Sequence, residues 1–186
     1  MTGAELAGLT LVLGGAASGK SAHAEGLVRQ MAAAAGAVPV YLATAEAHDA
    51  DMAARIRRHR ARRQGWQTRE APHDLPAALT AVPAGTPCLV DCLTLWLTNR
   101  LLADADLAGD EEALFAALAA RSAKGGRTVL VSNEVGQGIV PENALARRFR
   151  EAQGRLNQRI AARAERVILV TAGLPLALKG RLPGPA

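Results

Sequence analysis

Aromatic residues are scarce in this chain of 186 residues, which has two tryptophans, one tyrosine and two phenylalanines. Proteins that bind nucleic acids commonly combine a basic groove with aromatic side chains on which bases stack. The scarcity therefore argues against a nucleic-acid partner, although the formal net charge is +5. Lysine is rare as well, so arginine carries most of the positive charge. We expect this charge to serve the phosphates of a small molecule and ordinary solvated helix faces.

Cysteines are few too, since Cys88 and Cys92 are the only two. On one predicted strand they would point to the same face about 13 Å apart, which is too far for a disulfide. Cysteine and histidine nowhere cluster with the spacing of a zinc site. No apolar run approaches the roughly 20 residues that span a bilayer, and residues 6–17 follow Glu5 instead of the basic segment of a signal peptide. We therefore expect a cytoplasmic protein without a membrane span.

Short apolar runs alternate with helical patterns along the chain, as in an α/β fold with a largely parallel sheet flanked by helices. We predict strands over 10–13, 38–43, 88–91, 128–132 and 167–171. Helices are predicted over 20–35, 49–63, 93–103 and 110–123, and again from Pro141, after which apolar positions recur every three or four residues. The proline-bearing stretch 64–87 is expected to be irregular. The length suits a single P-loop domain over 1–181 and a disordered tail over 182–186.

One glycine-rich segment matches the P-loop pattern G-x-x-x-x-G-K-[ST] without a gap. It consists of Gly14, Gly15, Ala16, Ala17, Ser18, Gly19, Lys20 and Ser21, with an apolar strand before it and a helical pattern after it. In such a loop, backbone N–H groups surround phosphate oxygens at the start of a helix. Lys20 supplies a cation for the outer phosphates, and the Ser21 hydroxyl can bind Mg²⁺. The pattern and its context favour a nucleoside triphosphate site over a simple glycine-rich turn.

Asp91 directly follows the apolar run of residues 88–90. A Walker B carboxylate has this place at the carboxyl end of a buried strand, where it holds Mg²⁺ directly or through water. An aspartate there can instead cap the helix that follows. With a P-loop upstream, we favour the metal role and keep capping as the alternative.

Six arginines crowd the segment 55–63 around one histidine, His59. Nearby guanidinium groups lower the pKa of an imidazole and keep it neutral and nucleophilic at pH 7. They also neutralise the charge that develops on an attacked phosphate. His59 is thus a candidate nucleophile for a covalent nucleotidyl intermediate. A solvated basic helix face with a packed histidine is the alternative that charge and spacing alone allow.

Several motifs occur in an order that resembles one family. They are the P-loop, Tyr41–Glu46, the stretch from Asp51 to Arg60, Asp91–Asn99, Asn133–Asn143, Ala146–Arg150 and Gly154–Gln158. Together they resemble the bifunctional adenosylcobinamide kinases / adenosylcobinamide-phosphate guanylyltransferases of cobalamin biosynthesis, over about residues 9–179. Many families share the P-loop, whereas the Asn133–Asn143 block is highly specific.

The resemblance implies two reactions. ATP or GTP first phosphorylates the aminopropanol hydroxyl of adenosylcobinamide. GTP then guanylylates His59 with release of pyrophosphate, and the GMP passes to adenosylcobinamide phosphate to give adenosylcobinamide-GDP. The P-loop and Asp91 indicate Mg²⁺ as the cofactor. The resemblance implies a corrinoid as the small-molecule partner and a homotrimer as the assembly.

The resemblance further assigns site residues. The family's nucleophilic histidine corresponds to His59. The P-loop pattern itself gives Lys20 its catalytic role, and the motif patterns give Ser21 and Asp91 the metal. The implied nucleotide contacts are the P-loop and Thr44, Ala45, Glu46, Arg60, Ala61, Arg62, Arg63, Glu70 and Asp91. Two positions depart from the family, because residue 17 is alanine where arginine is common and residue 58 is arginine where some members carry a second histidine.

Some alternatives stay open at this point. The Asn133–Asn143 segment follows a predicted strand at the edge where ligands of α/β proteins collect, so Asn133 and Glu134 can orient the acceptor or the metal. A rigid turn that caps the next helix explains the same segment equally well. For the whole chain, the rivals are a P-loop kinase without a covalent step, a non-catalytic nucleotide-sensing module and a protein that binds nucleic acid through its arginines.

Overall fold

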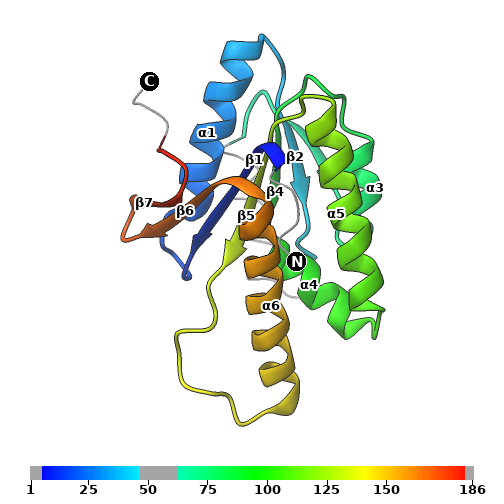
Figure 1. Cartoon of the computed structure of the whole chain (residues 1–186), viewed down its shortest axis with the longest axis vertical. Coiled ribbons are helices and arrows are strands. Elements are labelled where there is room, and N and C mark those ends of the chain that lie inside the picture. Colours follow the sequence, from blue (N-terminus) through cyan, green and yellow to red (C-terminus); the bar gives the residue numbers. More distant parts are fainter. Residues whose placement is uncertain (1–5, 47–62, 183–186) are drawn as a thin grey trace.

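The computed structural model describes residues 6–46 and 63–182 of the chain. These residues form one seven-stranded sheet with helices on both faces (Figure 1). The strands are β1 (Leu6–Gly14), β2 (Val40–Ala43), β3 (Gln67–Glu70), β4 (Cys88–Asp91), β5 (Thr128–Asn133), β6 (Ala164–Thr171) and β7 (Leu174–Lys179). The helices are α1 (Lys20–Ala35), α3 (Leu75–Thr80), α4 (Leu93–Leu102), α5 (Leu107–Ala123) and α6 (Ala144–Arg163).

The strands lie in the order β3-β2-β4-β5-β1-β6-β7. Neighbouring strands pair in parallel, except that β7 pairs with β6 in the antiparallel direction. Helix α1 covers one face of the sheet, and α3, α4, α5 and α6 cover the other (Figure 1). The predicted α/β class with a largely parallel sheet is therefore confirmed.

Burial on both faces explains the apolar runs of the central strands. In β1, Leu11 packs into the core with α3 to α6, whereas its neighbour Val12 packs into the core with α1. Both side chains have no exposed surface. Successive residues of β4 and β5 alternate between the two cores in the same way. This packing fixes the carboxyl ends of these strands, and the polar residues that follow them, along one edge of the sheet.

Helix α1 has the bounds that the sequence predicts. It ends at Gly36, whose backbone is left-handed with φ 59°. The N–H groups of Gly36 and Ala37 donate to the carbonyl oxygens of Ala33 and Ala32, at 3.3 Å and 3.0 Å. This pair of bonds is the Schellman motif, in which glycine avoids the steric cost of positive φ.

The prediction that residues 64–87 are irregular is wrong, because β3 and α3 lie within them. The four residues of β3 are polar and lie at the sheet edge, so no apolar alternation reveals them. Helix α3 begins after Asp74, whose carboxylate accepts a hydrogen bond from the N–H of Ala77 at 3.0 Å. An aspartate before a short apolar run is a typical N-cap, and Pro76 occupies the first turn.

Two element ends also differ from the prediction. The long helix α6 begins at Ala144 and not at Pro141, because the side chain of Asn143 caps it by accepting the N–H of Ala146 at 3.0 Å. The strand predicted to be last is followed by a turn at Ala172 and Gly173 and by the antiparallel β7.

The two cysteines lie on opposite sides of the sheet, so the prediction of one shared face is wrong. Cys88 packs into the core with α3 to α6, and Cys92 packs into the core with α1. The reason is that Cys92 lies beyond the end of β4, at the N-cap of α4. Both thiols are free, as their spacing predicts.

The helix predicted over 49–63 lies outside the described residues except for Arg63, which belongs to neither a helix nor a strand. Most of the predicted tail, residues 183–186, lies outside them as well. Among the helices that the structure describes, none combines the length and the apolar character needed to cross a membrane.

Candidate active site

The P-loop lies between β1 and α1, at the carboxyl edge of the parallel strands. Gly14 is the last residue of β1 and Lys20 the first residue of α1. Between them, Ala17 and Gly19 adopt left-handed backbone conformations, with φ 56° and 92°. The first N–H groups of a helix have no partner inside the helix, and their partial positive charge favours anions. The loop and the start of α1 therefore form a site suited to phosphate oxygens.

Gly14 is required by the tight packing of the loop. A Cβ atom at this position would lie 2.4 Å from Oγ of Ser18 and 2.6 Å from the carbonyl oxygen of Val170. The N–H of Gly173 donates to the carbonyl oxygen of Ser18 at 2.9 Å. The end of β6 and the turn after it thus support the loop from outside, which the sequence pattern alone does not reveal.

Lys20 is nearly buried, with 7% of its surface exposed. Its Nζ donates a hydrogen bond to the carbonyl oxygen of Gly15 at 2.9 Å. The ammonium group therefore lies against the backbone of the loop instead of extending into solvent. A cation held there can pair with the outer phosphates of a nucleotide that the loop binds.

Asp91 ends β4, two strands away from β1 in the sheet. Its Oδ2 accepts a hydrogen bond from the phenolic oxygen of Tyr41 at 3.1 Å. The N-cap of α4 is Cys92, with no side-chain capping bond. Asp91 is thus not used as a helix cap, and the alternative left open by the sequence loses its support.

Arg63 packs against Tyr41, the residue that donates to Asp91. Its guanidinium carbon lies 3.4 Å from the ring centroid of Tyr41, and only 6% of the residue is exposed. The Nε and Nη1 atoms of Arg63 are buried without a hydrogen-bond partner. Buried donors without a partner cost roughly 1–3 kcal/mol or more each, so they mark a place where a ligand acceptor would stabilise the protein.

Burial raises the pKa of Tyr41, and the negative charge of Asp91 raises it further. Tyr41 therefore keeps its proton at neutral pH and acts as a hydrogen-bond donor to the carboxylate. The sequence alone gives no role to Tyr41, because a tyrosine within an apolar strand is typical of a core residue.

Thr44 joins β2 to the start of α4. Its hydroxyl donates to the carbonyl oxygen of Cys92 at 2.7 Å and accepts the N–H of Cys92 at 2.8 Å. Asn99 donates to the carbonyl oxygen of Thr44 at 2.9 Å. Since Thr44 has no exposed surface, its side chain serves the protein interior, and a nucleotide contact at this position would fall to the following residues.

Glu46 and Glu70 lie close to that junction. Ala43, which ends β2, is in register with Asp91 of β4 and with Glu70 of β3. Glu46 follows two residues after Thr44, and its Oε1 lies 3.1 Å from Nε2 of His73. The predicted contacts Thr44, Ala45, Glu46, Glu70 and Asp91 therefore gather at the carboxyl ends of β2, β3 and β4.

The segment Asn133–Asn143 begins beside the P-loop. The N–H of Glu134 donates to the carbonyl oxygen of Gly14 at 3.1 Å, and the N–H of Asn133 donates to Oγ1 of Thr94 at 2.8 Å. The Oδ1 atom of Asn133 is buried without a partner. From there the segment and the first turns of α6 project away from the sheet (Figure 1).

A buried polar network fixes the base of this projection. Ser132 donates to Oδ1 of Asn157 at 2.7 Å, and Gln153 donates to the same oxygen at 3.0 Å. Asn157 in turn donates to the carbonyl oxygen of Asn133 at 3.1 Å. The helix-cap alternative is also present, since Asn143 caps α6, so the segment has a structural role in addition to its place beside the loop.

Among the described residues, no group of three or more histidine, cysteine, aspartate or glutamate side chains is placed to hold a metal ion. A Mg²⁺ ion in a nucleotide site needs only one or two protein oxygens, because the substrate phosphates and water supply its other ligands. Ser21 in the first turn of α1 and Asp91 at the end of β4 supply a hydroxyl and a carboxylate on the same sheet edge. Both are partly accessible.

Comparison with known proteins identifies the family to which this chain is similar. The family described as cobinamide kinase / cobinamide phosphate guanyltransferase, CobU, matches residues 10–178. The chain belongs to this family. It is therefore a bifunctional kinase and guanylyltransferase, as the motifs predict.

Two relatives show how far the similarity extends. A bifunctional adenosylcobalamin biosynthesis protein, CobP of Pseudomonas aeruginosa, is 50% identical over 174 residues, which cover 91% of this chain and 96% of that protein. The bifunctional adenosylcobalamin biosynthesis protein CobU of Salmonella typhimurium is 40% identical over 187 residues, which cover 92% and 99%. This CobU family member is thus similar to both relatives over nearly their whole length.

A solved structure supports the fold alone. The flagellar accessory protein FlaH of Methanocaldococcus jannaschii superposes with a TM-score of 0.52 at 12% identity, and the match covers 96% of this chain and 80% of that one.

The structure brings most of the predicted residues of this CobU family member to one edge of the sheet. His59, Arg60, Ala61 and Arg62 lie outside the described residues, so their roles stay predictions. Arg63, which directly follows them, lies against Tyr41 and carries the unpartnered donors.

Proposed function

We propose that this chain phosphorylates adenosylcobinamide with ATP or GTP and then transfers GMP from GTP to adenosylcobinamide phosphate through a guanylylated His59. One observation carries the proposal. The P-loop with its buried Lys20 lies at the same carboxyl edge of the sheet as Asp91. The guanidinium of Arg63, with its unpartnered donors, contacts Tyr41, which donates a hydrogen bond to Asp91. Membership of the family supports the choice of acceptor.

In the kinase step, the hydroxyl oxygen of the acceptor attacks the γ-phosphorus, a P–O bond forms, and the nucleoside diphosphate leaves as the hydroxyl loses its proton. The N–H groups of the P-loop bind the phosphates, and Lys20 neutralises charge on the outer ones. Mg²⁺, held by Ser21 and Asp91, would neutralise further charge on the phosphate oxygens. Tyr41 orients the carboxylate of Asp91 for this purpose.

In the transfer step, a ring nitrogen of His59 attacks the α-phosphorus of GTP. A P–N bond forms, the bond to the bridging oxygen breaks, and pyrophosphate leaves. A phosphate oxygen of adenosylcobinamide phosphate then attacks the same phosphorus, the P–N bond breaks, and adenosylcobinamide-GDP forms. Guanidinium groups such as that of Arg63 would stabilise the charge that develops on the attacked phosphate.

Labelling with radioactive GTP tests the covalent step. With ³²P at the α-position, the denatured protein should keep an acid-labile, base-stable label, whereas GTP with ³²P at the γ-position should leave none. His59→Ala should abolish the label and the guanylyl transfer but retain kinase activity. His73→Ala, which removes a partly exposed histidine, should keep the label. A wild-type protein without α-label but with kinase activity would support the rival kinase without a covalent step.

We also propose that the protein assembles as a homotrimer. The resemblance to the family implies the trimer, and β7 supports self-association because Leu174, Leu176 and Leu178 are 73%, 59% and 55% exposed on this edge strand. A row of exposed leucines at a sheet edge is typical of a contact surface.

A further inference from the structure

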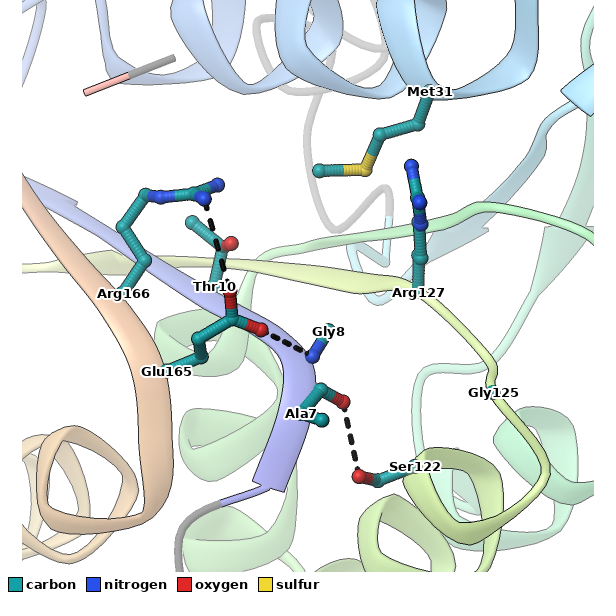
Figure 2. Close-up of a pocket in the computed structure, with 9 residues that line it drawn as sticks. All are labelled: Ala7, Gly8, Thr10, Met31, Ser122, Gly125, Arg127, Glu165 and Arg166. Carbon is teal, nitrogen blue, oxygen red and sulfur yellow. Dashed lines mark hydrogen bonds and ion pairs between the residues drawn. The ribbon is translucent and has the colours of Figure 1, made fainter. Parts of the chain in front are cut away.

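A cavity of about 360 Å³ lies at the amino edge of the sheet, at the opposite end of β1 from the P-loop (Figure 2). Its walls are the first residues of β1 and β6, the residue before β5, the end of α5, and Met31 of α1. A volume of this size is within the range of about 300–1,000 Å³ that is usual for small-molecule sites. The proposed reactions use nothing at this edge.

Two arginines face the cavity from either side of β1. Arg127 directly precedes β5 and Arg166 belongs to β6, and these strands are the two neighbours of β1. In Figure 2 both side chains extend toward α1, the helix that carries Met31. Two guanidinium groups, one from β6 and one from the residue before β5, are thus directed to one space that is bounded on a further side by the apolar side chain of Met31.

The charge of the cavity is only partly balanced. Glu165 is the carboxylate in the lining, and its Oε2 accepts the N–H of Gly8 at 2.6 Å. The other oxygen of Glu165 lies 3.8 Å from Nη2 of Arg166, which is a long ion pair. The Nε of Arg166 is buried and has no hydrogen-bond partner. The guanidinium of this lining arginine therefore keeps one donor without an acceptor, and in the lining two positive charges face one negative charge.

The chemistry of these groups selects the ligand class. A guanidinium group binds oxyanions through two parallel N–H bonds, with carboxylate and phosphate as the usual acceptors. A carboxylate has two oxygens and satisfies one such fork, whereas a phosphate group has at least three oxygens available and can satisfy donors from two arginines. Met31 and the small residues of β1 leave room for an uncharged remainder of the molecule.

We propose that this cavity is a second binding site, separate from the P-loop, for a small molecule that carries a phosphate group. The guanidinium groups of Arg166 and Arg127, which line the cavity from two sides, bind the phosphate. The site does not depend on the proposed function, because none of its residues takes part in either reaction.

The arginine side chains themselves provide the measurement. The full-length protein is first saturated with a non-hydrolysable GTP analogue and Mg²⁺, so that the P-loop site is filled. Inorganic phosphate is then titrated at constant ionic strength while the ¹H–¹⁵N signals of the arginine Nε–H groups are recorded, with acetate as the carboxylate probe. The signals of residues 127 and 166 are identified by their loss in Arg127→Ala and Arg166→Ala.

The signals of both arginines should shift saturably with phosphate and little with acetate. Either alanine variant should weaken the apparent phosphate affinity about tenfold or more, as expected for the loss of a charge-assisted fork. Arg155→Ala, which removes an arginine that is 65% exposed on α6, should leave the affinity unchanged. If Arg166→Ala does not fold, Arg127→Ala decides alone, because Arg127 is exposed and its loss uncovers no core.

Three results would overturn the proposal. The first is the absence of a saturable shift, and the second is an equal response to acetate. The third is an affinity that stays the same in the variants at positions 127 and 166, since phosphate would then bind elsewhere. None of these results would affect the labelling of His59 or the kinase activity.

Discussion

Tyr41 donates a hydrogen bond from its phenolic oxygen to Oδ2 of Asp91 at 3.1 Å, while the guanidinium of Arg63 lies 3.4 Å from the centroid of its ring. One tyrosine therefore contacts both the carboxylate that is predicted to hold Mg²⁺ and an arginine that is predicted to bind the nucleotide. The residue lies on β2, and β2 pairs directly with the strand of Asp91. Its position makes Tyr41 an orienting residue for both partners.

Tyr41→Phe separates the two contacts, because the ring beneath Arg63 stays and the hydrogen bond to Asp91 is lost. Hydrogen bonds to metal-binding side chains typically contribute about 10- to 100-fold to metal affinity or activity. We expect the Mg²⁺ concentration for half-maximal pyrophosphate release to rise about tenfold, with little change in the apparent affinity for GTP at saturating Mg²⁺.

Tyr41→Leu serves as the companion variant, since it removes the ring as well. It should raise the Mg²⁺ requirement and also weaken GTP binding. An unchanged Mg²⁺ requirement in Tyr41→Phe would show that Asp91 needs no orientation by Tyr41.

Gly14 and Gly15 offer a matched test of the P-loop. A Cβ atom at Gly14 would clash with Ser18 and Val170, whereas a Cβ atom at Gly15 would meet no atom within 4 Å. Gly14→Ala should therefore lower the unfolding free energy by about 1–3 kcal/mol through overpacking, and should reduce GTP binding at least tenfold. Gly15→Ala should unfold at nearly the wild-type denaturant concentration. Equal unfolding midpoints for the two variants would contradict the close approach seen at Gly14.

The parts of the fold that the sequence predicts well are those with local signals. The bounds of α1 follow from the P-loop at one end and Gly36 at the other, and β4 follows from its apolar run. In contrast, β3 is a polar edge strand whose pairing with β2 is set by contacts distant in sequence. The leucines of β7 alternate with the period of two that is typical of a strand. Their side chains are exposed and not buried in the core, so the usual interpretation of an apolar face as a core face does not apply to them.

The same distinction applies to the site. A pattern of consecutive residues identifies the P-loop and Asp91, because the chemistry there depends on the local backbone. The group formed by Tyr41, Arg63 and Asp91 joins residues up to 50 positions apart, and spacing along the chain contains no information about it. The sequence does not reveal the internal role of Thr44 for the same reason, since its partners Cys92 and Asn99 become neighbours only in the folded protein.

Arg121 is predicted to matter for stability and not for catalysis. It is 4% exposed, and it donates to the carbonyl oxygens of Val82 and Thr86 at 2.8 Å and 3.1 Å. Arg121→Met would leave these two carbonyl oxygens unpaired, and since each buried acceptor without a partner costs roughly 1–3 kcal/mol, the loss should be about 2–6 kcal/mol. Urea unfolding of Arg121→Met should show a loss of this size.

Arg155→Met is the control for that measurement, because its exposed pair with Glu151 should contribute no more than about 1 kcal/mol. Arg121→Lys keeps the charge without the planar fork and should fall between wild type and Arg121→Met. A stability of Arg121→Met equal to that of Arg155→Met would show that the buried bonds contribute nothing net.

The two buried thiols predict an alkaline loss of stability. Burial raises the pKa of Cys92 to about 11 and that of Cys88 to about 12, from an ordinary value of 9.0. A folded-state pKa above the unfolded one gives stability that is complete below pH 9 and is lost as the pH rises toward these values, because the unfolded chain releases its protons first. The free energy of unfolding should therefore fall between about pH 9 and pH 11.

Cys88→Ala combined with Cys92→Ala should flatten this fall without removing it, since burial raises the pKa of Tyr41 in the same direction. At pH 8 the native protein should react slowly with a thiol reagent, and both thiols should react at once in denaturant. Rapid modification of the native protein would be incompatible with the burial of Cys88 and Cys92.

The exposed leucines of β7 are the proposed contact between subunits. Alternate residues of a strand share one face, so Leu174, Leu176 and Leu178 form a continuous exposed row at the edge of the sheet. A lysine in the middle of this row would place a charge inside the proposed contact, and burying an unpaired charge is strongly unfavourable. Leu176→Lys should therefore convert a trimer into monomers in light scattering coupled to size-exclusion chromatography. Leu102→Lys, at a leucine that is 64% exposed at the end of α4, should keep the wild-type mass, and a trimer that survives Leu176→Lys would exclude β7 from the contact.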